Sequence, residues 1–422
     1  MKNRELMVVE AKKLMGTNFN PIITSFLDTD LYKFTMQQTV YHQFPNAQEV
    51  QFNFKCRSKD INLVEHIDEI NKQIDWLCSL DFQEDEVNYL RTLRYIKSDY
   101  ADFLTLFKFQ RKYINVVAID ENEIDIVIKG PWLHTILFEV PVLAIVNEVF
   151  FKNTQSPEVL VEGEKRLDAK IDVVLQSNDE DFKFSDFGTR RRYSFDWQEK
   201  VVQNLKNTLE DNFTGTSNVY FAMKYDLTPI GTMAHEYLQA CQALGPRLRD
   251  SQKFALEKWV QEYRGDLGIA LTDVVGVDAF LEDFDLYFCK LFDGVRHDSG
   301  NPYEWADKML NHYDKMKIDA KTKSFVFSDS LDFEKALDLY NTYKGRVKTF
   351  FGIGTNLTND LGLKPINIVL KMTECNGSPV AKISDSDGKT MCHNNAYLTY
   401  LKQVFHIGQD PQPTLKNVKK LK

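Results

Sequence analysis

The 422-residue sequence has few of the features that mark secreted, membrane-spanning or zinc-binding proteins. Its six cysteines lie far apart with no CxxC pair, which argues against a disulfide framework and a zinc site. The eight histidines form no HxxxH or HExxH pattern. Residues 1–20 lack the apolar core of a signal peptide, and no uninterrupted apolar run of about 18 residues occurs. We therefore expect reduced thiols, a cytoplasmic location and no membrane partner.

Positive charge is also scarce. The chain has 52 Lys and Arg against 61 Asp and Glu, a net charge of -9. Proteins that bind nucleic acid normally present a basic face, so we expect no nucleic-acid partner. An anionic substrate would be repelled by the whole chain, and positive charge must then be concentrated locally. The run Arg190 to Arg192 could supply it.

The composition is that of an ordinary globular protein, with 43% hydrophobic and 27% charged residues. The length suits a barrel of about 250 residues and a second module. The first third reads as mixed α+β, with apolar periodicities that switch between those of helices and strands. We predict helices at 30–42, 61–80, 84–98 and 143–151, a strand at 49–57 and a hairpin at 116–128 that turns at 121–122.

From about residue 184 the pattern changes to short apolar segments that end in Gly, Asp, Ser or Thr and precede helical stretches. The segments are 184–188, 215–218, 229–232, 269–272, 293–296, 325–328, 349–352 and 367–371. The following helices are expected at 234–244, 277–284, 302–312, 332–343 and 358–361. Repeated βα units predict a parallel α/β sheet, and about eight of them suggest an irregular, TIM-like (β/α) barrel. An open doubly wound sheet is the alternative.

This reading divides the chain into four parts. Residues 1–20 form an extension, 21–150 an amino-terminal α+β domain and 151–375 the barrel. Residues 376–422 form a C-terminal segment that we expect to return to the amino-terminal domain. The polar motifs follow the predicted barrel strands, and barrel enzymes carry their chemistry at that end of the strands.

The most informative residue is His235, in the run Pro229-Ile-Gly-Thr-Met-Ala-His-Glu-Tyr237. A neutral histidine nitrogen can attack a phosphoryl group and hold it covalently. The alternative for a lone histidine is a hydrogen-bonded polar group near a core. Its context favours the first reading, because arginine forks and glycine-bordered loops, both of which bind phosphate, lie before and after it.

Three other segments carry candidate ligands. In Phe184-Ser-Asp-Phe-Gly-Thr-Arg-Arg-Arg192, Arg190 is a candidate anion ligand, whereas Arg191 and Arg192 could equally be surface residues. In Gly294-Val-Arg-His-Asp-Ser-Gly-Asn-Pro302, Arg296 is a second candidate. Asp298 of the same run could be a ligand or a helix N-cap, although Ser299 or Asn301 would cap better. The segment with Gly352, Gly354 and Thr355 predicts a phosphate cradle.

Taken together, these motifs resemble the nicotinate phosphoribosyltransferase family. The resemblance begins at Ser25-Phe-Leu-Asp-Thr-Asp-Leu-Tyr-Lys-Phe-Thr-Met36 and continues into Lys371-Met-Thr-Glu374. It implies an amino-terminal domain packed against an irregular α/β barrel. The implied enzyme, classified as a ligase, makes nicotinate mononucleotide and pyrophosphate from nicotinate and phosphoribosyl pyrophosphate. It also implies Mg²⁺ and coupling to hydrolysis of ATP in NAD biosynthesis.

The resemblance assigns roles to individual residues. In the family, ATP phosphorylates the histidine that corresponds to His235. Thr232 is expected to face the same pocket because it lies one turn before His235. The pyridine ring lies between Tyr32 and Phe187, which could otherwise be core aromatics. Arg296 lies at the nicotinate and ribose end, Asp298 near the ribose hydroxyls with an additional role in holding Mg²⁺ through water, and Thr355 at the 5′-phosphate. No residue is assigned as a direct metal ligand, and Asn301 stands where many members of the family have Asp, which puts a metal role there in doubt.

Ser217 bears on the choice of substrate. Relatives that use nicotinamide carry an acidic residue at this position, which would repel the carboxylate of nicotinate. Serine removes that repulsion, so nicotinate is the expected substrate. An ordinary turn without ligand contact is the alternative.

Several other functions share some of these features. Asp186-Phe187-Gly188 matches a kinase motif, but the glycine-rich loop, the lysine and the HRD segment of kinases are missing. The same fold acting on nicotinamide, quinolinate phosphoribosyltransferase, a silent phosphosugar-binding sensor and an acidic scaffold remain as rivals. The resemblance also allows a homodimer, because some relatives complete the site with an aromatic residue of a partner subunit.

Overall fold

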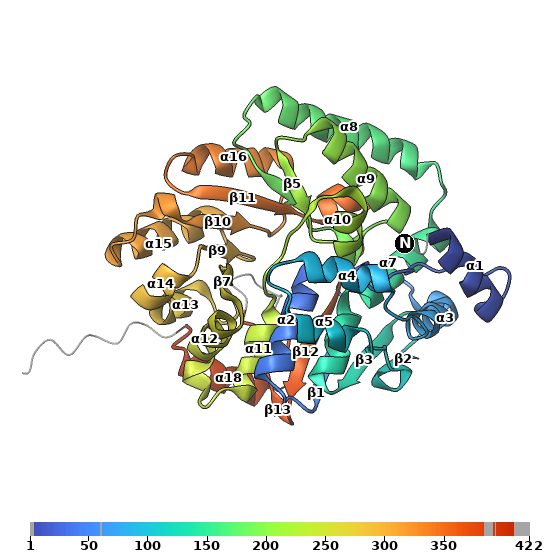
Figure 1. The fold of residues 1–422 in the computed structure, drawn as a ribbon, viewed down its shortest axis with the longest axis horizontal. Coiled ribbons are helices and arrows are strands. Elements are labelled where there is room, and N and C mark those ends of the chain that lie inside the picture. The colour runs from blue at the N-terminus through green and yellow to red at the C-terminus, as the bar shows by residue number, and fades with distance from the viewer. Residues whose placement is uncertain (1–3, 60, 384–390, 393, 409–422) are drawn as a thin grey trace, which may run out of the picture.

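Two sheets organise the protein (Figure 1). The computed structural model describes residues 4–59, 61–383, 391–392 and 394–408. Within them, one sheet has seven parallel strands and the other has five antiparallel strands. This arrangement confirms the predicted fold class, a barrel-like α/β unit joined to an α+β unit.

The parallel sheet contains seven of the eight strands that the sequence predicts for the barrel. Its spatial order is β6-β5-β4-β11-β10-β9-β8. The strands are β4 (Phe184–Asp186), β5 (Phe213–Thr216), β6 (Thr228–Pro229), β8 (Ile269–Leu271), β9 (Gly294–His297), β10 (Ser324–Phe327) and β11 (Lys348–Ile353). The sheet is curled. Because β6 and β8 are its two edges and do not pair with each other among the described residues, it forms a partial barrel and not a closed one. Between them in sequence lie α11 (His235–Leu244), α12 (Ser251–Tyr263) and the short strand β7 (Arg264–Leu267).

The eighth expected barrel strand, 367–371, belongs to the other sheet, and its assignment to the barrel is wrong. These residues start β12 (Ile368–Cys375), which pairs antiparallel with β1 (Val50–Cys56) from Val50 opposite Cys375 to Cys56 opposite Ile368. The apolar run of β12 reads like a barrel strand because most of its side chains are buried. The amino-terminal sheet therefore includes a strand from near the end of the chain.

The antiparallel sheet has the order β13-β12-β1-β3-β2. Its other strands are β2 (Ile114–Ala118), β3 (Ile124–Gly130) and β13 (Ser378–Pro379). The predicted hairpin is confirmed, since β2 and β3 pair antiparallel up to Ala118 opposite Ile124. A sheet assembled from both ends of the chain places residues after 367 beside the amino-terminal strands.

Helices surround both sheets, and most of the predicted ones are present with shifted ends. The helix predicted at 84–98 already ends at Thr92, and the next helix starts only at Ser98. The helix predicted at 358–361 lies earlier, at 355–358. The remaining helices are α1 (Arg4–Met15), α2 (Leu31–Gln43), α3 (Ile67–Leu77), α4 (Glu84–Thr92), α5 (Ser98–Leu104), α6 (Trp132–Thr135), α7 (Glu139–Thr154), α8 (Val159–Ser177), α9 (Phe195–Thr208), α10 (Val219–Tyr225), α13 (Val277–Asp283), α14 (Leu286–Leu291), α15 (Pro302–Lys315), α16 (Phe333–Tyr343), α17 (Thr355–Thr358) and α18 (Asn395–Val404).

One helical stretch, Trp132–Thr154, is long and apolar enough to cross a membrane when judged by length and composition alone. In the fold, 83% of its most apolar window is buried inside the protein. Helix α7 in this stretch packs on α3, on β12 and on the turn at Thr189–Arg191. It is thus the helix between the two halves of the molecule, and its apolar surface is used in their packing.

A buried ion pair joins the two halves. Arg192 follows β4 and pairs through both outer nitrogens with Asp28, which precedes α2, at 2.6 and 2.8 Å. Both side chains are fully buried. Asn218 donates a further hydrogen bond to Asp28 at 2.8 Å. Arg192 is therefore a structural residue that fixes the segment before α2 onto the parallel sheet.

Candidate active site

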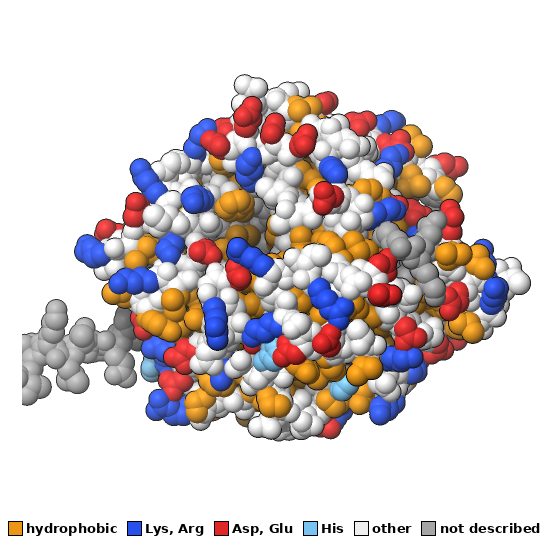
Figure 2. Space-filling view, viewed as in Figure 1, with side chains coloured by type: hydrophobic (Ala, Val, Ile, Leu, Met, Phe, Trp, Pro, Cys, Tyr) orange, Lys and Arg blue, Asp and Glu red, His pale blue; other side chains and the backbone are white. Residues whose placement is uncertain are grey.

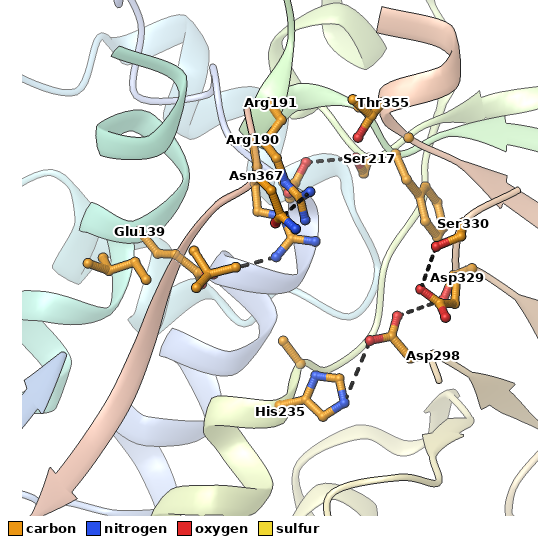
Figure 3. A pocket seen from close by; sticks show the side chains of 18 of the residues that line it. Glu139, Arg190, Arg191, Ser217, His235, Asp298, Asp329, Ser330, Thr355 and Asn367 are labelled. Atoms are coloured by element: carbon orange, nitrogen blue, oxygen red, sulfur yellow. Dashed lines mark hydrogen bonds and ion pairs between the residues drawn. The ribbon is translucent and has the colours of Figure 1, made fainter. Parts of the chain in front are cut away.

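A cavity of about 660 Å³ opens at the carboxyl ends of the parallel strands (Figure 3). Its wall is completed by α2, by the start of α11 and by β12. A volume of this size suits a nucleotide-sized ligand. The sequence-predicted residues that line it are Tyr32, Phe187, Arg190, Ser217, His235, Arg296, Asp298, Gly354 and Thr355.

His235 is the first residue of α11 and is held by a carboxylate that follows β8. Its Nε2 lies 2.8 Å from Oδ1 of Asp273, and both side chains are buried. The other oxygen of Asp273 contacts Nζ of Lys382 at 2.7 Å and accepts a hydrogen bond from Ser299. The carboxylate is therefore shared between the imidazole, an ammonium group and a hydroxyl.

This environment keeps the imidazole neutral. Burial and the charge of Lys382 lower the pKa of His235 to about 4, against the attraction of Asp273. Burial alone would raise the pKa of Asp273, but His235 and Lys382 hold it well below its ordinary value. An ionised carboxylate at Nε2 places the imidazole proton on that nitrogen and leaves the lone pair on Nδ1. The residue is therefore a neutral imidazole in a fixed orientation, the form in which a histidine can act as a nucleophile.

Asp298 lies beside this pair at the wall of the cavity (Figure 3). Its Oδ2 is 3.7 Å from Nε2 of His235, and its Oδ1 accepts a hydrogen bond from Ser328 at 3.0 Å. The ligand atoms of His235, Asp273 and Asp298 all lie within 4.8 Å of one another, a grouping that could hold a metal ion. Asp298 is thus a site residue and not the cap of α15.

The cap of α15 is Asn301, whose side chain accepts hydrogen bonds from the backbone N–H groups of Tyr303 and Glu304 at 2.9 and 3.3 Å. This satisfies two of the free N–H groups at the start of the helix. The capping role anticipated for Asn301 is confirmed. This contact gives the side chain of Asn301 a structural role at the start of α15.

The cavity concentrates positive charge in an acidic protein. Arg190 and Arg296 line it as expected, and the buried Nε of Arg296 has no hydrogen-bond partner among the described residues. Four further cations that no sequence motif singles out also line the cavity, Arg57, Lys364, Lys371 and Lys382. The face shown in Figure 2 carries acidic and basic side chains intermixed. The local basic concentration predicted for an anionic substrate is therefore inside the cavity.

The position of Lys371 in the sequence explains why a cation in the cavity wall could not be predicted there. It interrupts the apolar run of β12, where a lysine would ordinarily be read as the exposed end of a strand. In the fold, burial lowers its pKa to about 8, with the charges of Lys382 and Arg190 acting in the same direction and Glu139 opposing them. Because β12 lies outside the barrel, nothing in the sequence places Lys371 in the wall of the same cavity as His235.

Two aromatic rings and a glycine shape one part of the wall. Phe187 follows β4, and its ring lies against Gly352 so closely that a Cβ at Gly352 would be 2.2 Å from two ring atoms. Gly352 therefore supports Phe187 from behind and does not itself line the cavity. Tyr32 lines the cavity from the first turn of α2. The geometry leaves both rings available to a flat ligand.

The hydroxyl of Ser217 contacts an acidic side chain that is distant in sequence, Asp30. This hydroxyl donates to Oδ1 of Asp30 at 2.7 Å. Burial raises the pKa of Asp30, although the charge of Arg190 and the hydrogen bond from Ser217 oppose the rise. A carboxyl group thus remains near Ser217, but its charge is offset by Arg190.

Thr232 does not reach the cavity. Its hydroxyl donates to the backbone carbonyl of Ile269 at 3.2 Å, and its own carbonyl accepts from Thr35 at 2.7 Å. It fastens the loop before α11 to β8 and α2. Glu236 also turns away from His235 and pairs with Lys33, as expected for adjacent residues on a helix.

Polar side chains collected at the carboxyl edge of a curled parallel sheet are typical of α/β-barrel enzymes. The fold and the cavity assign the chain to that class.

Comparison with known proteins narrows the assignment. Residues 27–147 match the model of the nicotinate phosphoribosyltransferase N-terminal domain, and residues 182–409 match that of the nicotinate phosphoribosyltransferase family. The nicotinate phosphoribosyltransferase of Ralstonia nicotianae is 59% identical over 388 residues, which cover 92% of this chain and all of that one. That of Burkholderia mallei is 58% identical over 393 residues, covering 92% and 98% of the two chains.

Solved structures agree. The nicotinate phosphoribosyltransferase of Vibrio cholerae superposes with a TM-score of 0.87 at 40% identity, covering 92% of this chain and 95% of that one. That of Porphyromonas gingivalis gives 0.86 at 32% identity, with 92% and 100% covered. The chain belongs to the nicotinate phosphoribosyltransferase family.

Proposed function

We propose that this protein makes nicotinate mononucleotide and pyrophosphate from nicotinate and phosphoribosyl pyrophosphate, a step of NAD biosynthesis, and couples it to hydrolysis of ATP through phosphorylation of His235. The observation that carries the coupling is the neutral imidazole, oriented by Asp273, in the wall of a cation-lined cavity. Family membership supports the transfer reaction.

In the transfer step, the pyridine nitrogen attacks the anomeric carbon of the phosphoribosyl group, and the bond from that carbon to pyrophosphate breaks. The transition state resembles an oxocarbenium ion, as in other glycosyl transfers. The enzyme's task is to align the two reactants and to neutralise the departing charge. We assign the ring to Tyr32 and Phe187 and the anionic groups to Arg190, Arg296 and the loop at Gly354 and Thr355.

In the coupling step, Nδ1 of His235 attacks the terminal phosphorus of ATP, a phosphorus–nitrogen bond forms, and ADP leaves with the electron pair of the broken bond. Water later hydrolyses the phosphohistidine and releases phosphate. Asp273 would hold the Nε2 proton throughout and stabilise the cationic ring of the phosphorylated state. Two enzyme states with different affinities can convert the free energy of ATP into a displaced equilibrium.

We also assign Mg²⁺ to this cavity. Carboxylate oxygens are the protein ligands that Mg²⁺ prefers, and the carboxylate of Asp298 faces the cavity with 30% of its side chain exposed. When bound, the ion would neutralise phosphate oxygens of the substrates. Asp298 would hold it, directly or through water, together with those phosphates.

We also propose a cellular location, an enzyme class and an oligomeric state. All six cysteines are free thiols in the structure, in keeping with a cytoplasmic enzyme. The coupled reaction would class the protein as a ligase. A homodimer is compatible with the family.

The experiment is a product assay with phosphoribosyl pyrophosphate and Mg²⁺, offering nicotinate or nicotinamide, each with and without ATP. We expect nicotinate mononucleotide, ADP released with product, and little product from nicotinamide. Product without any ADP release would overturn the coupling and leave the transfer reaction standing. Efficient use of nicotinamide would overturn the role of Ser217. No product from either base would leave a binding role as the better account.

A further inference from the structure

Next to the cavity lies a buried charged cluster that the proposed chemistry does not use. It consists of Lys33 from α2, Glu139 at the start of α7 and Glu236 from α11, called here the Lys33 cluster. Lys33 is fully buried, and its Nζ lies 2.6 Å from Oε2 of Glu139 and also contacts Oε2 of Glu236. Trp132 donates to the other oxygen of Glu236 at 3.1 Å.

Glu139 is divided between two cations. Its Oε2 is held by Lys33, and its Oε1 lies 3.5 Å from Nη1 of Arg190 (Figure 3). The carboxylate is closer to the lysine, and the side chain of Arg190 keeps 37% of its surface exposed toward the cavity. Arg190 is thus only partly neutralised by its protein neighbour.

Lys33 supplies the positive charge at the centre of the cluster. Burial alone would raise the pKa of Glu139, but Lys33, Arg190 and Lys371 lower it to about 2, so the carboxylate stays ionised. Burial would lower the pKa of Lys33, but the two glutamates raise it. Burial raises the pKa of Glu236, although Lys33 opposes the rise. Lys33 is thus the cation that contacts both carboxylates of the cluster. Without Lys33, the buried, ionised carboxylate of Glu139 would keep Arg190 as its ion-pair partner among the described residues.

We propose that Lys33 is a positioning residue, which draws the carboxylate of Glu139 away from Arg190 and so leaves that guanidinium able to bind an anionic group of a substrate. This inference rests on the proposed function, in which the anion is the carboxylate of nicotinate or a phosphate of phosphoribosyl pyrophosphate. Lys33 touches neither substrate. The hydrogen bond from Trp132 and the place of Glu236 next to His235 fix the far side of the cluster on α11.

The test is a suppressor experiment on the full-length enzyme. Steady-state KM for nicotinate and for phosphoribosyl pyrophosphate, together with kcat, is measured for Lys33→Met, Glu139→Gln and the double variant. In Lys33→Met, Glu139 pairs with Arg190 alone, and we expect KM for one of the two substrates to rise by about tenfold or more. In the double variant the competing carboxylate is gone, and that KM returns to within about threefold of the wild-type value.

The pattern of KM values decides whether Lys33 positions Glu139 as proposed. A selective rise that Glu139→Gln reverses supports the proposal, and the affected substrate tells whether Arg190 takes the carboxylate or a phosphate. A rise in both KM values that Glu139→Gln does not reverse, or no rise at all, overturns it. If Lys33→Met fails to fold, Lys33→Gln takes its place in the same comparison. Wild-type turnover is measured alongside. If the wild-type enzyme makes no product, the proposed function fails, whereas an active wild type with unchanged KM values in Lys33→Met contradicts only the role of Lys33.

Discussion

At the scale of single residues, the candidate site depends on a carboxylate that no sequence motif predicts. Asp273 stands alone after β8, without a motif, yet it orients His235 and is balanced by Lys382. The run containing His235 could be singled out because phosphate-binding loops surround it in sequence. Its partner could not, because the pairing depends on how β8 and α11 meet in space.

We predict that Asp273→Asn abolishes most of the ATP hydrolysis while leaving the fold intact. The amide cannot stabilise a cationic imidazole and can hold the ring in the wrong tautomer, so the rate of phosphoenzyme formation should fall by about 100-fold or more. Incorporation of label from γ-labelled ATP measures it. Asp278→Asn, at an exposed carboxylate five residues on, is the matched control. Near-normal labelling of Asp273→Asn would show that the carboxylate does not orient the nucleophile.

The pH dependence of phosphorylation should reveal the neutral histidine. With a pKa of about 4, His235 stays unprotonated well below the ordinary value of 6.5. We expect the initial rate of phosphoenzyme formation to stay level down to about pH 5. A fall with a midpoint near 6.5 would mean that the imidazole is not desolvated as described.

The same shift has a consequence for stability. A folded-state pKa below the unfolded value stabilises the protein above about pH 6.5, and this contribution is lost as the pH falls toward 4. His235→Ala should therefore lose less of its free energy of unfolding than the wild type over that window. Denaturant unfolding at several pH values measures the difference.

At the scale of elements, the βα pattern was informative and its last member was misleading. Seven barrel strands could be located because each apolar segment ends in a polar loop residue and precedes a helix. The segment 367–371 has the same appearance but no helix follows it, and it joins β1 instead. Apolar sequence alone does not say which sheet buries a strand, so Lys371 on β12 was not expected in the cavity wall.

The contact between β11 and the loop after β4 can be tested at Gly352. A Cβ there would overlap the ring of Phe187, so Gly352→Ala must displace the ring. We predict a rise of about tenfold in KM for nicotinate, since the ring would no longer lie flat against the ligand. Phe187→Leu should have a similar effect, and the double variant should be no worse than either single one. Additive losses in the double variant would show that Gly352 acts on something other than the ring.

At the scale of the whole molecule, a buried ion pair and helix α7 join the two sheets. We predict that Arg192→Met lowers the free energy of unfolding by about 3–5 kcal/mol, because it leaves the carboxylate of Asp28 buried without its cation. Chemical denaturation monitored by tryptophan fluorescence measures the change. Arg191→Met is the matched control. The side chain of Arg191 lines the cavity, and its hydrogen bond to Asn367 is long, at 3.4 Å. Equal destabilisation by both variants would contradict the structural role of Arg192.

The antiparallel sheet also bears on how the protein is made. Strand β1 emerges from the ribosome about 300 residues before its neighbour β12, so for most of synthesis it presents an unpaired edge. A chain that terminates before β12 would keep the unpaired edge of β1 and would lack Lys371 and Lys382. The antiparallel sheet therefore stays incomplete until β12 has been synthesised, and β1 keeps an exposed edge until then.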